Sequence, residues 1–316
     1  RRQRQMCIRD SVRPARSVSN RSIPTDTSAP GPMAIAARCS AAAFSMTDER
    51  VRLWEPEDGF AWAEGTMRLL GRLTGASNGT FLVEVTDEEG TARRCIHKPV
   101  AGERPLWDFP TGTLAEREVA SARLSARAGF DVVPPTTLVD GPFGMGMLQQ
   151  WIDADRLEQW VRIDPPGRTP PGWFAILEGV DGDDNDVVLA HADHEALRRI
   201  ALFDAIINNS DRKGYHLLPV SAESGEHSMT RVWGVDHGVT WHQDDKLRTI
   251  LWGWAGEPLR DDEIGLVTLA DEVIDGLDDL ISADEVIAAH RRCERLLEGG
   301  MPLPSDDWPS IPWPPL

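Results

Sequence analysis

The hydrophobic pattern changes its period near residue 113, from the alternation typical of strands to the spacing typical of amphipathic helices. Residues 67–100 contain an apolar run, a Gly/Ser/Asn turn at 75–80, an alternating run and a last strand that ends at Lys98-Pro99. This succession predicts an antiparallel β-meander. Since strands come first and helices follow, the pattern favours an α+β fold.

Helices are expected over 114–129, 194–208 and 263–298, where apolar residues recur at helical spacing. Two strands around a Gly/Pro turn are expected over 132–152, and a short buried strand that opens into a glycine turn over 231–241. An antiparallel β part is therefore expected to precede a mainly helical part. The predicted boundaries are 1–46 for an Arg/Ser-rich leader, 47–152 for the β part, 153–300 for the helical part and 301–316 for a Pro-rich tail.

The leader contains eight arginines and two acids and has no apolar period, so we expect it to be disordered. Met33 or Met46 would then be alternative starts, and a targeting segment is the other interpretation. The tail has six prolines in 302–316 and is expected to be extended. Residues 164–172, rich in proline and glycine, predict an insertion loop.

The charge balance argues against two classes of partner. After residue 46 the chain has 25 basic and 49 acidic residues, which repel nucleic acid and anionic lipid surfaces. No polybasic stretch or spanning segment is present, so stable membrane association is not expected. The four cysteines lie far apart in the sequence, which indicates a reducing, cytoplasmic location.

Three charged residues carry the functional hypothesis. Asp211 follows an apolar helix within NNSDRKGYH, and Asp236 follows a buried strand within VDHG. Lys98 ends a strand, and it is one of only three lysines against thirty arginines. Two carboxylates and a strand lysine are the groups that phosphoryl transfer from a magnesium nucleotide requires. A polar turn and an edge-strand lysine are the structural alternatives.

These motifs resemble the protein-kinase-like superfamily, and within it the phosphatidylinositol 3-/4-kinase-like branch. Lys98-Pro99 is similar to the K-P of type II phosphatidylinositol 4-kinases, residues 209–212 to their N-T-D-R, and residues 235–238 to their I-D-N-G. NNSDRKG, WGVDHGVTWH and KLRTILWGWAGEPL look like a family of mainly actinobacterial proteins with the same kinase-like assignment. The likeness covers about residues 70 to 256. It implies a bilobal protein-kinase-like fold, with residues 47–152 as an antiparallel β small lobe and residues 153–300 as a mainly helical large lobe.

The resemblance implies an enzyme, a kinase that transfers phosphate from ATP with Mg²⁺ to an alcohol group. Asp211 would be the catalytic base, and Lys213 would lie beside the transferred phosphoryl group. Asp236 would be the main metal ligand. The implied nucleotide-binding residues are Gly75, Ser77 and Gly79 of the turn, Lys98, its partner Glu118, and the backbone of Gln149 and Gln150, with Met145, Met147 and Trp151 as apolar lining.

His216 stands where kinases commonly have a metal-binding asparagine. Imidazole is a softer ligand than Mg²⁺ prefers, so either Asn208 or Asn209 would take that role, or the site would accept Mn²⁺, or metal affinity would be poor. A catalytically silent ATP-binding pseudokinase scaffold and a kinase-fold AMP transferase therefore remain alternatives.

The acidic charge favours a protein or a soluble small molecule over a membrane lipid as acceptor. Residues 242–259, with Trp252 and Trp254, are the candidate acceptor surface, and ordinary core is the alternative for that tryptophan pair.

Overall fold

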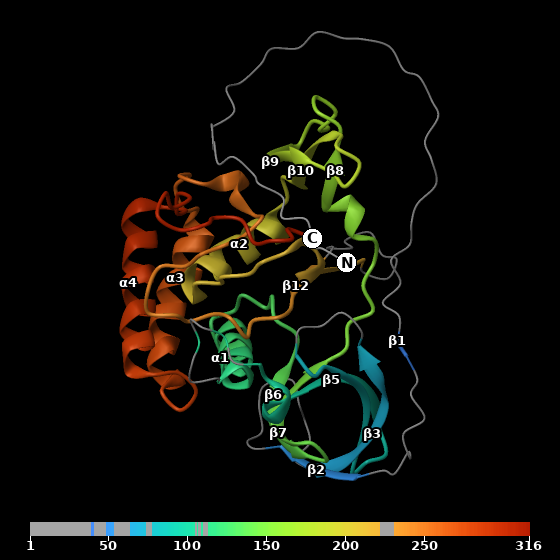
Figure 1. Ribbon diagram of the computed structural model, residues 1–316. Coiled ribbons are helices and arrows are strands. Elements are labelled where there is room, and N and C mark those ends of the chain that lie inside the picture. The colour runs from blue at the N-terminus through green and yellow to red at the C-terminus, as the bar shows by residue number, and fades with distance from the viewer. Residues whose placement is uncertain are drawn as a thin grey trace. The chain divides into compact units, whose positions relative to one another are not determined.

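The computed structural model describes residues 39–40, 49–53, 64–73, 78–104, 106, 109, 113–221 and 231–316 (Figure 1). The chain divides into two compact units, Arg1–Ala37 and Arg38–Leu316, and everything below concerns the second. Apart from the two residues of β1 (Cys39–Ser40), the predicted leader lies outside the described residues, as do Gly75 and Ser77.

Seven strands form one sheet with the order β1-β3-β2-β6-β7-β5-β4. Because β3 pairs with β4 as well as with β2, strands β2 to β7 close on themselves, and every pairing is antiparallel. The side chains enclosed by this closed sheet include Met67, Val83, Val85, Cys95, Val139 and Leu148. The predicted meander and the two later strands are confirmed. Their bounds are β2 (Glu49–Leu53), β3 (Glu64–Leu73), β4 (Phe81–Asp87), β5 (Ala92–Pro99), β6 (Thr136–Gly141) and β7 (Gly144–Gln150).

Helix α1 (Leu114–Arg127) lies between β5 and β6 in the chain and packs against β6, β7 and α3. The helix begins where the carboxylate of Glu103 accepts the backbone N–H groups of Leu114 and Ala115, at 3.4 and 3.0 Å, as an N-terminal cap does. It ends before Gly129, whose φ of 73° is the left-handed conformation that stops helices. The predicted helix over 114–129 is confirmed.

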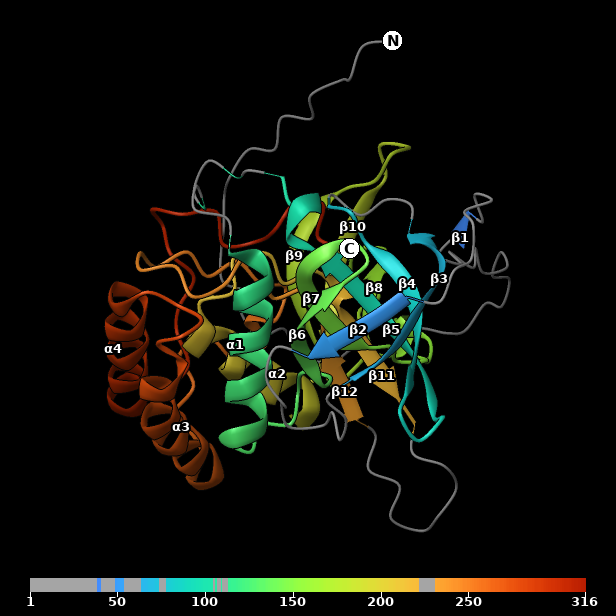
Figure 2. The ribbon, with the colours of Figure 1, turned by 90° about the horizontal axis from the view of Figure 1, so that it is seen from below.

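The described residues after β7 include three α-helices, α2 (Glu195–Ile207), α3 (Asp261–Ile274) and α4 (Ala283–Gly299). Helices α3 and α4 lie side by side (Figures 1 and 2), and His290 of α4 links them by contacts of its ring nitrogens with Asp271 at 2.7 Å and Asp275 at 3.1 Å.

Five further strands accompany these helices. A three-stranded sheet has the order β8-β10-β9, and β11 pairs with β12. The described part is thus a mixed α/β protein with antiparallel sheets and four α-helices, and the expected mainly helical large lobe is met only in part. Residues 164–172 do connect strands, but β9 and β10 were not predicted because β9 is half-exposed and lacks a clean apolar alternation. The bounds are β8 (Val161–Asp164), β9 (Trp173–Val180), β10 (Asp186–Ala192), β11 (Leu217–Val220) and β12 (Arg231–Gly234).

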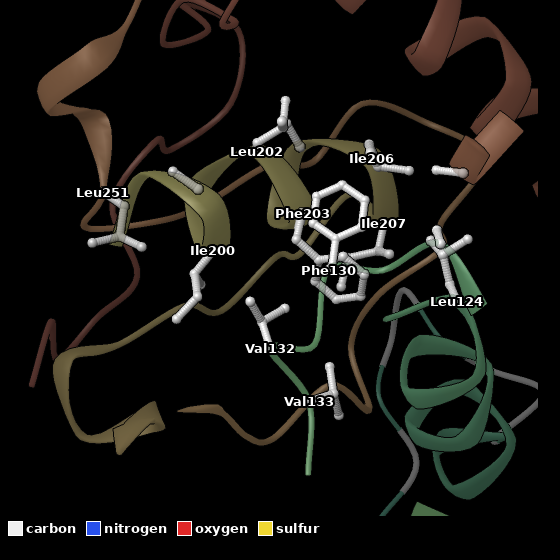
Figure 3. Close-up of a cluster of buried hydrophobic side chains, with 14 of the residues drawn as sticks. Leu124, Phe130, Val132, Val133, Ile200, Leu202, Phe203, Ile206, Ile207 and Leu251 are labelled. Carbon is white, nitrogen blue, oxygen red and sulfur yellow. The ribbon is translucent and has the colours of Figure 1, made fainter. Parts of the chain in front are cut away.

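The main core surrounds α2. Figure 3 shows Phe203 and Ile207 of α2 against Phe130 and Val132, which follow α1. The rings of Phe130 and Phe203 are 5.2 Å apart. Each fully buried side chain of this size contributes about 1.5–3 kcal/mol, so the core fixes α2 firmly. Consequently the residues that follow α2 begin from a rigid position.

The Pro-rich tail has no helix or strand, as predicted. It nevertheless packs on the second half of the chain: the N–H of Gly214 donates to Pro315 at 2.9 Å, and the indole of Trp252 donates to Ser310 at 2.9 Å. The tail is therefore an extended segment that packs against the rest of the chain.

Candidate functional site

Lys98, Glu118 and Asp236 meet although they come from β5, α1 and the turn after β12. The Lys98 ammonium donates to Glu118 Oε1 at 2.6 Å and to Asp236 Oδ1 at 2.8 Å. Burial disfavours the charged ammonium, but the two carboxylates outweigh it and raise the pKa of Lys98. Three residues that were singled out from separate motifs therefore form one charged cluster.

Glu118 holds two segments at once. Its Oε1 accepts from Lys98, and its Oε2 accepts the backbone N–H of His237 at 2.9 Å. The side chain is 2% exposed, so water cannot replace either partner easily. A Cβ at Gly238 would lie 3.3 Å from the Cβ of Leu114, which shows how closely this turn approaches α1. Glu118 thus fixes both the lysine and the turn that carries Asp236.

Asp236 has an uncommon backbone conformation, with φ at 62°. A non-glycine residue in this region costs of order 1–3 kcal/mol, and such residues gather at functional sites. The charge of Lys98 holds the pKa of Asp236 far below its ordinary value, despite the opposing effect of burial. The side chain is half-exposed and stays ionised.

The chain leaves α2 through Asn208, which adopts the left-handed conformation at φ 54°. The next asparagine, Asn209, accepts the backbone N–H of Asp211 on its side-chain oxygen at 3.0 Å. Asp211 pairs with Lys213 at 3.1 Å. Burial raises the pKa of Asp211, with Lys213 opposing this effect and the charge of Asp236 adding to it. Asp211 is thus a stronger base than an ordinary aspartate, and it is close enough to Asp236 to respond to its charge.

A fully buried ion pair, not anticipated from the sequence, supports both aspartates. Arg212 donates to Asp204 through Nε and Nη2, both at 2.8 Å, and the two side chains have no exposed surface. Its Nη1 donates to the carbonyl of Val235 at 2.8 Å. Arg212 therefore joins α2, the Asp211 loop and the segment before Asp236. The signal that could have found Asp204 is a lone acid within the apolar run Leu202–Ile207.

Two of the three expected metal ligands, Asp236 and His216, lie together. His216 Nε2 is 3.3 Å from Asp236 Oδ2. Burial lowers the pKa of His216 to about 4, so its imidazole is neutral at ordinary pH and can donate a lone pair to a metal.

The two asparagines at the end of α2 are engaged elsewhere. Asn209 is fully buried and its amide donates to Asp204 at 3.0 Å, so the structure places it in the supporting network. The amide of Asn208 donates to the carbonyls of His242 and Asp244, at 2.9 and 2.6 Å. Both side chains therefore stabilise the loops around the site, and neither joins Asp236 and His216.

Asp236 and His216 are two possible ligands, and among the described residues no group of three or more His, Cys, Asp or Glu could hold a metal ion. Mg²⁺ commonly keeps several waters and binds one or two carboxylates together with substrate phosphates. The pair therefore fits a metal ion that arrives with a nucleotide, and it does not form a complete metal site of its own.

Of the predicted nucleotide-binding residues, Gly79, Lys98, Glu118, Gln149 and Gln150 fall in the described part of the chain. The N–H of Gly79 donates to Gly102 at 3.2 Å, which places the end of the glycine turn beside the segment after Lys98. Gln149 is paired with β5 and β6, and the N–H of Gln150 donates to Pro135 at 2.9 Å. The backbones of these two glutamines are therefore paired within the protein, and they do not form the free hinge edge that was expected.

The expected acceptor surface around the tryptophan pair is wrong for Trp254. This side chain is 1% exposed, its indole donates to Asp193 at 3.0 Å, and it packs on Phe174 and His191. Trp252 is half-buried under the tail. Trp254 is therefore a core residue. Burial of a large aromatic side chain contributes most to stability when the whole ring is enclosed.

The fold and site together define a mixed α/β protein with a charged cluster between a closed antiparallel sheet and the loops that follow α2 and β12. The chain is 44% identical over 267 residues to Protein Rv2133c of Mycobacterium tuberculosis (strain ATCC 25618 / H37Rv), a match that covers 80% of this chain and 93% of that protein. The chain belongs to the same family as Rv2133c. No family model matches it. Among the described residues, no helix has the length and apolar character needed to cross a membrane.

Proposed function

We propose that the protein is an ATP-dependent phosphotransferase whose acceptor is an alcohol group. The observation that carries this proposal is the contact of Lys98 with both Glu118 and Asp236, beside an aspartate of raised pKa, Asp211. In this proposal the closed sheet with α1 and the helices α2 to α4 are the two lobes of a kinase-like fold.

Lys98 would bind the nucleotide phosphates. Its ammonium is a compact charge held at the end of β5 by Glu118, whose second oxygen is fixed by the N–H of His237. Phosphate binding would require Lys98 to exchange Asp236 for phosphate oxygens, which frees the Asp236 carboxylate.

Asp211 would accept the proton of the acceptor hydroxyl. Burial raises its pKa, and Asn209 holds its backbone N–H at 3.0 Å. Lys213, 3.1 Å from Asp211, would neutralise charge that develops on the transferred group. Arg212 does not touch the reacting groups; it positions Asp211 through its buried pair with Asp204.

Asp236 and His216 would hold Mg²⁺, or Mn²⁺, that enters with ATP. The metal supplies charge neutralisation at the phosphates. A protein or soluble small-molecule hydroxyl is the favoured acceptor, because the folded part carries excess negative charge that anionic lipid repels.

A silent nucleotide-binding scaffold is the second candidate. The specific observation in its favour is that only two possible metal ligands, one of them a histidine, meet near Lys98 in the described part.

The test is transfer of label from γ-³²P-ATP, with ATP hydrolysis and ATP affinity measured in parallel, in Mg²⁺ and in Mn²⁺. Asp211→Ala and Asp236→Ala are compared with Asp183→Ala, which changes an exposed aspartate in the turn between β9 and β10. Turnover that both site variants lose and the control keeps is expected. Binding of ATP without turnover in either metal would support the scaffold, and no ATP binding would refute both candidates.

Two further arms define the reaction. Label transfer from α-³²P-ATP would indicate AMP transfer in place of phosphate transfer. Soluble proteins and small molecules are compared with phosphoinositide vesicles as acceptors, and label on the vesicles alone would refute the proposed acceptor class.

A further inference from the structure

A cavity lies between α2, α4 and the segment that follows α4. It has a volume of about 560 Å³, which is the size of pockets for small organic ligands. Apolar side chains line it, among them Trp252, Leu296 and Met301, together with two arginines of α4, Arg292 and Arg295. Lys98, Asp211 and Asp236 do not line this cavity, although Trp252 in its wall belongs to the segment 242–259 that was considered for the acceptor.

Arg292 is the unusual group in its wall, because it is a buried cation that is 4% exposed. Its Nε donates to the carbonyl of Ile206 at 2.7 Å and its Nη1 to that of His242 at 3.3 Å. Among the described residues its Nη2 has no hydrogen-bond partner, and the charges of Asp245 and Glu285 act on Arg292 without an ion pair to it. Burial lowers the pKa of Arg292 to about 10, which leaves it charged at neutral pH.

A structural role explains only part of this arrangement. Ile206 lies in the last turn of α2, where a cation favourably meets the partial negative charge of the helix end. The contact with Ile206 uses only Nε, and the helix end carries only about half a negative charge. Nη2 therefore stays without a hydrogen-bond partner, and burying a charge without a carboxylate beside it is costly.

The charges in the wall determine which ligand fits. Arg295 pairs with Asp245 at 2.8 Å, and both side chains line the cavity. The charges of Arg295 and Asp245 cancel each other. Arg292 therefore gives the cavity wall one net positive charge, next to the apolar side chains. We propose that the cavity binds a small organic monoanion, whose carboxylate pairs with Arg292 and whose apolar body packs against Trp252 and Leu296. A doubly charged phosphate group is a poorer match for a single net charge.

Decanoate is a suitable probe, with decan-1-ol and decylamine as uncharged and cationic controls of the same chain length. Binding to the full chain is measured by titration calorimetry and by the fluorescence of Trp252, compared with a Trp252→Phe variant. Saturable binding of decanoate at one site is expected, with clearly weaker binding of both controls. Arg292→Met should weaken decanoate binding about ten- to a hundredfold, while Arg291→Gln, an exposed arginine of the same helix that does not line the cavity, should not change it.

A variant at the rim keeps the test valid if Arg292→Met fails to fold. Leu303 lines the cavity and is 71% exposed, so Leu303→Asp introduces an opposing charge without disturbing the core. It should weaken decanoate binding more than Leu303→Asn does, since the two variants differ only in charge, whereas both should bind decan-1-ol alike. The proposal is overturned if decanoate does not bind, if decanoate and decan-1-ol bind equally well, or if Leu303→Asp and a folded Arg292→Met both bind decanoate like the unaltered protein.

Discussion

Asp204→Asn should strongly destabilise the fold, although it changes no residue of the charged cluster of Lys98, Glu118 and Asp236. The change removes the charge from a fully buried carboxylate and leaves the Arg212 guanidinium buried without a counter-ion. Two hydrogen bonds of 2.8 Å to Arg212 and one of 3.0 Å from Asn209 are weakened or lost. Breaking a buried ion pair at one partner costs about 3–5 kcal/mol, so we expect a loss of that size in the free energy of unfolding.

Urea unfolding followed by circular dichroism measures this loss. Asp153→Asn is the matched control, since it makes the same chemical change in the exposed pair with Arg94, and surface substitutions usually stay within about 0.5 kcal/mol. The double variant Asp204→Leu/Arg212→Met removes both charges and should recover much of the stability, because a buried pair can be replaced by apolar side chains.

The recovered stability should come without recovered activity, since Arg212 would no longer hold Val235 and the Asp211 loop. A loss below about 1 kcal/mol in Asp204→Asn would refute the role of the pair in the fold. Full phosphotransfer by the double variant would refute its positioning role.

Three further outcomes are expected. Lys98→Met should abolish ATP binding measured by calorimetry while the protein stays folded, and unchanged affinity would contradict the phosphate-binding role. Gly146→Ala puts a Cβ 2.5 Å from the backbone oxygen of Lys98, so β5 and β7 must separate; both the melting temperature and ATP affinity should fall, and a variant that loses neither would show that the sheet adapts. Burial disfavours protonated His290, but its two aspartate partners outweigh this and raise its pKa, so the link between α3 and α4 is fully present below the ordinary histidine pKa of about 6.5 and is lost as the pH rises through the higher folded value. The melting-temperature advantage over His290→Gln should therefore shrink above neutral pH, and a constant difference would argue against the link.

The sequence predicted those parts of the fold that have a clear hydrophobic period. The meander, α1 and α2 are of this kind, and so is the position of Glu118 on a helix that follows the strand of Lys98. The contact of Lys98 with Asp236 could only be expected from the order of motifs, because 138 residues separate them. Strands β9 and β10 were missed, since a half-exposed hairpin leaves no regular alternation.

Other parts depend on tertiary structure alone. Asp204 has the same side chain as many surface aspartates, and only the burial of α2 on all sides makes it the partner of Arg212. Asn209 was expected as a metal ligand and is instead enclosed beside Asp204, because the loop turns inward after Asn208. For Trp254 the sequence left an acceptor surface and the core as alternatives, and the side chain lies in the core. In each case the residue type is compatible with both places, and the packing of distant segments decides.

The two oxygens of Glu118 have a consequence for how the protein can be synthesised and divided. One oxygen joins a residue 20 positions earlier, and the other joins a backbone group 119 positions later. A nascent chain that has not yet produced His237 can form the first contact but cannot close the second. The cluster therefore cannot exist in either half of a chain cut between β10 and α2, and two such fragments would regain it only by reassociating.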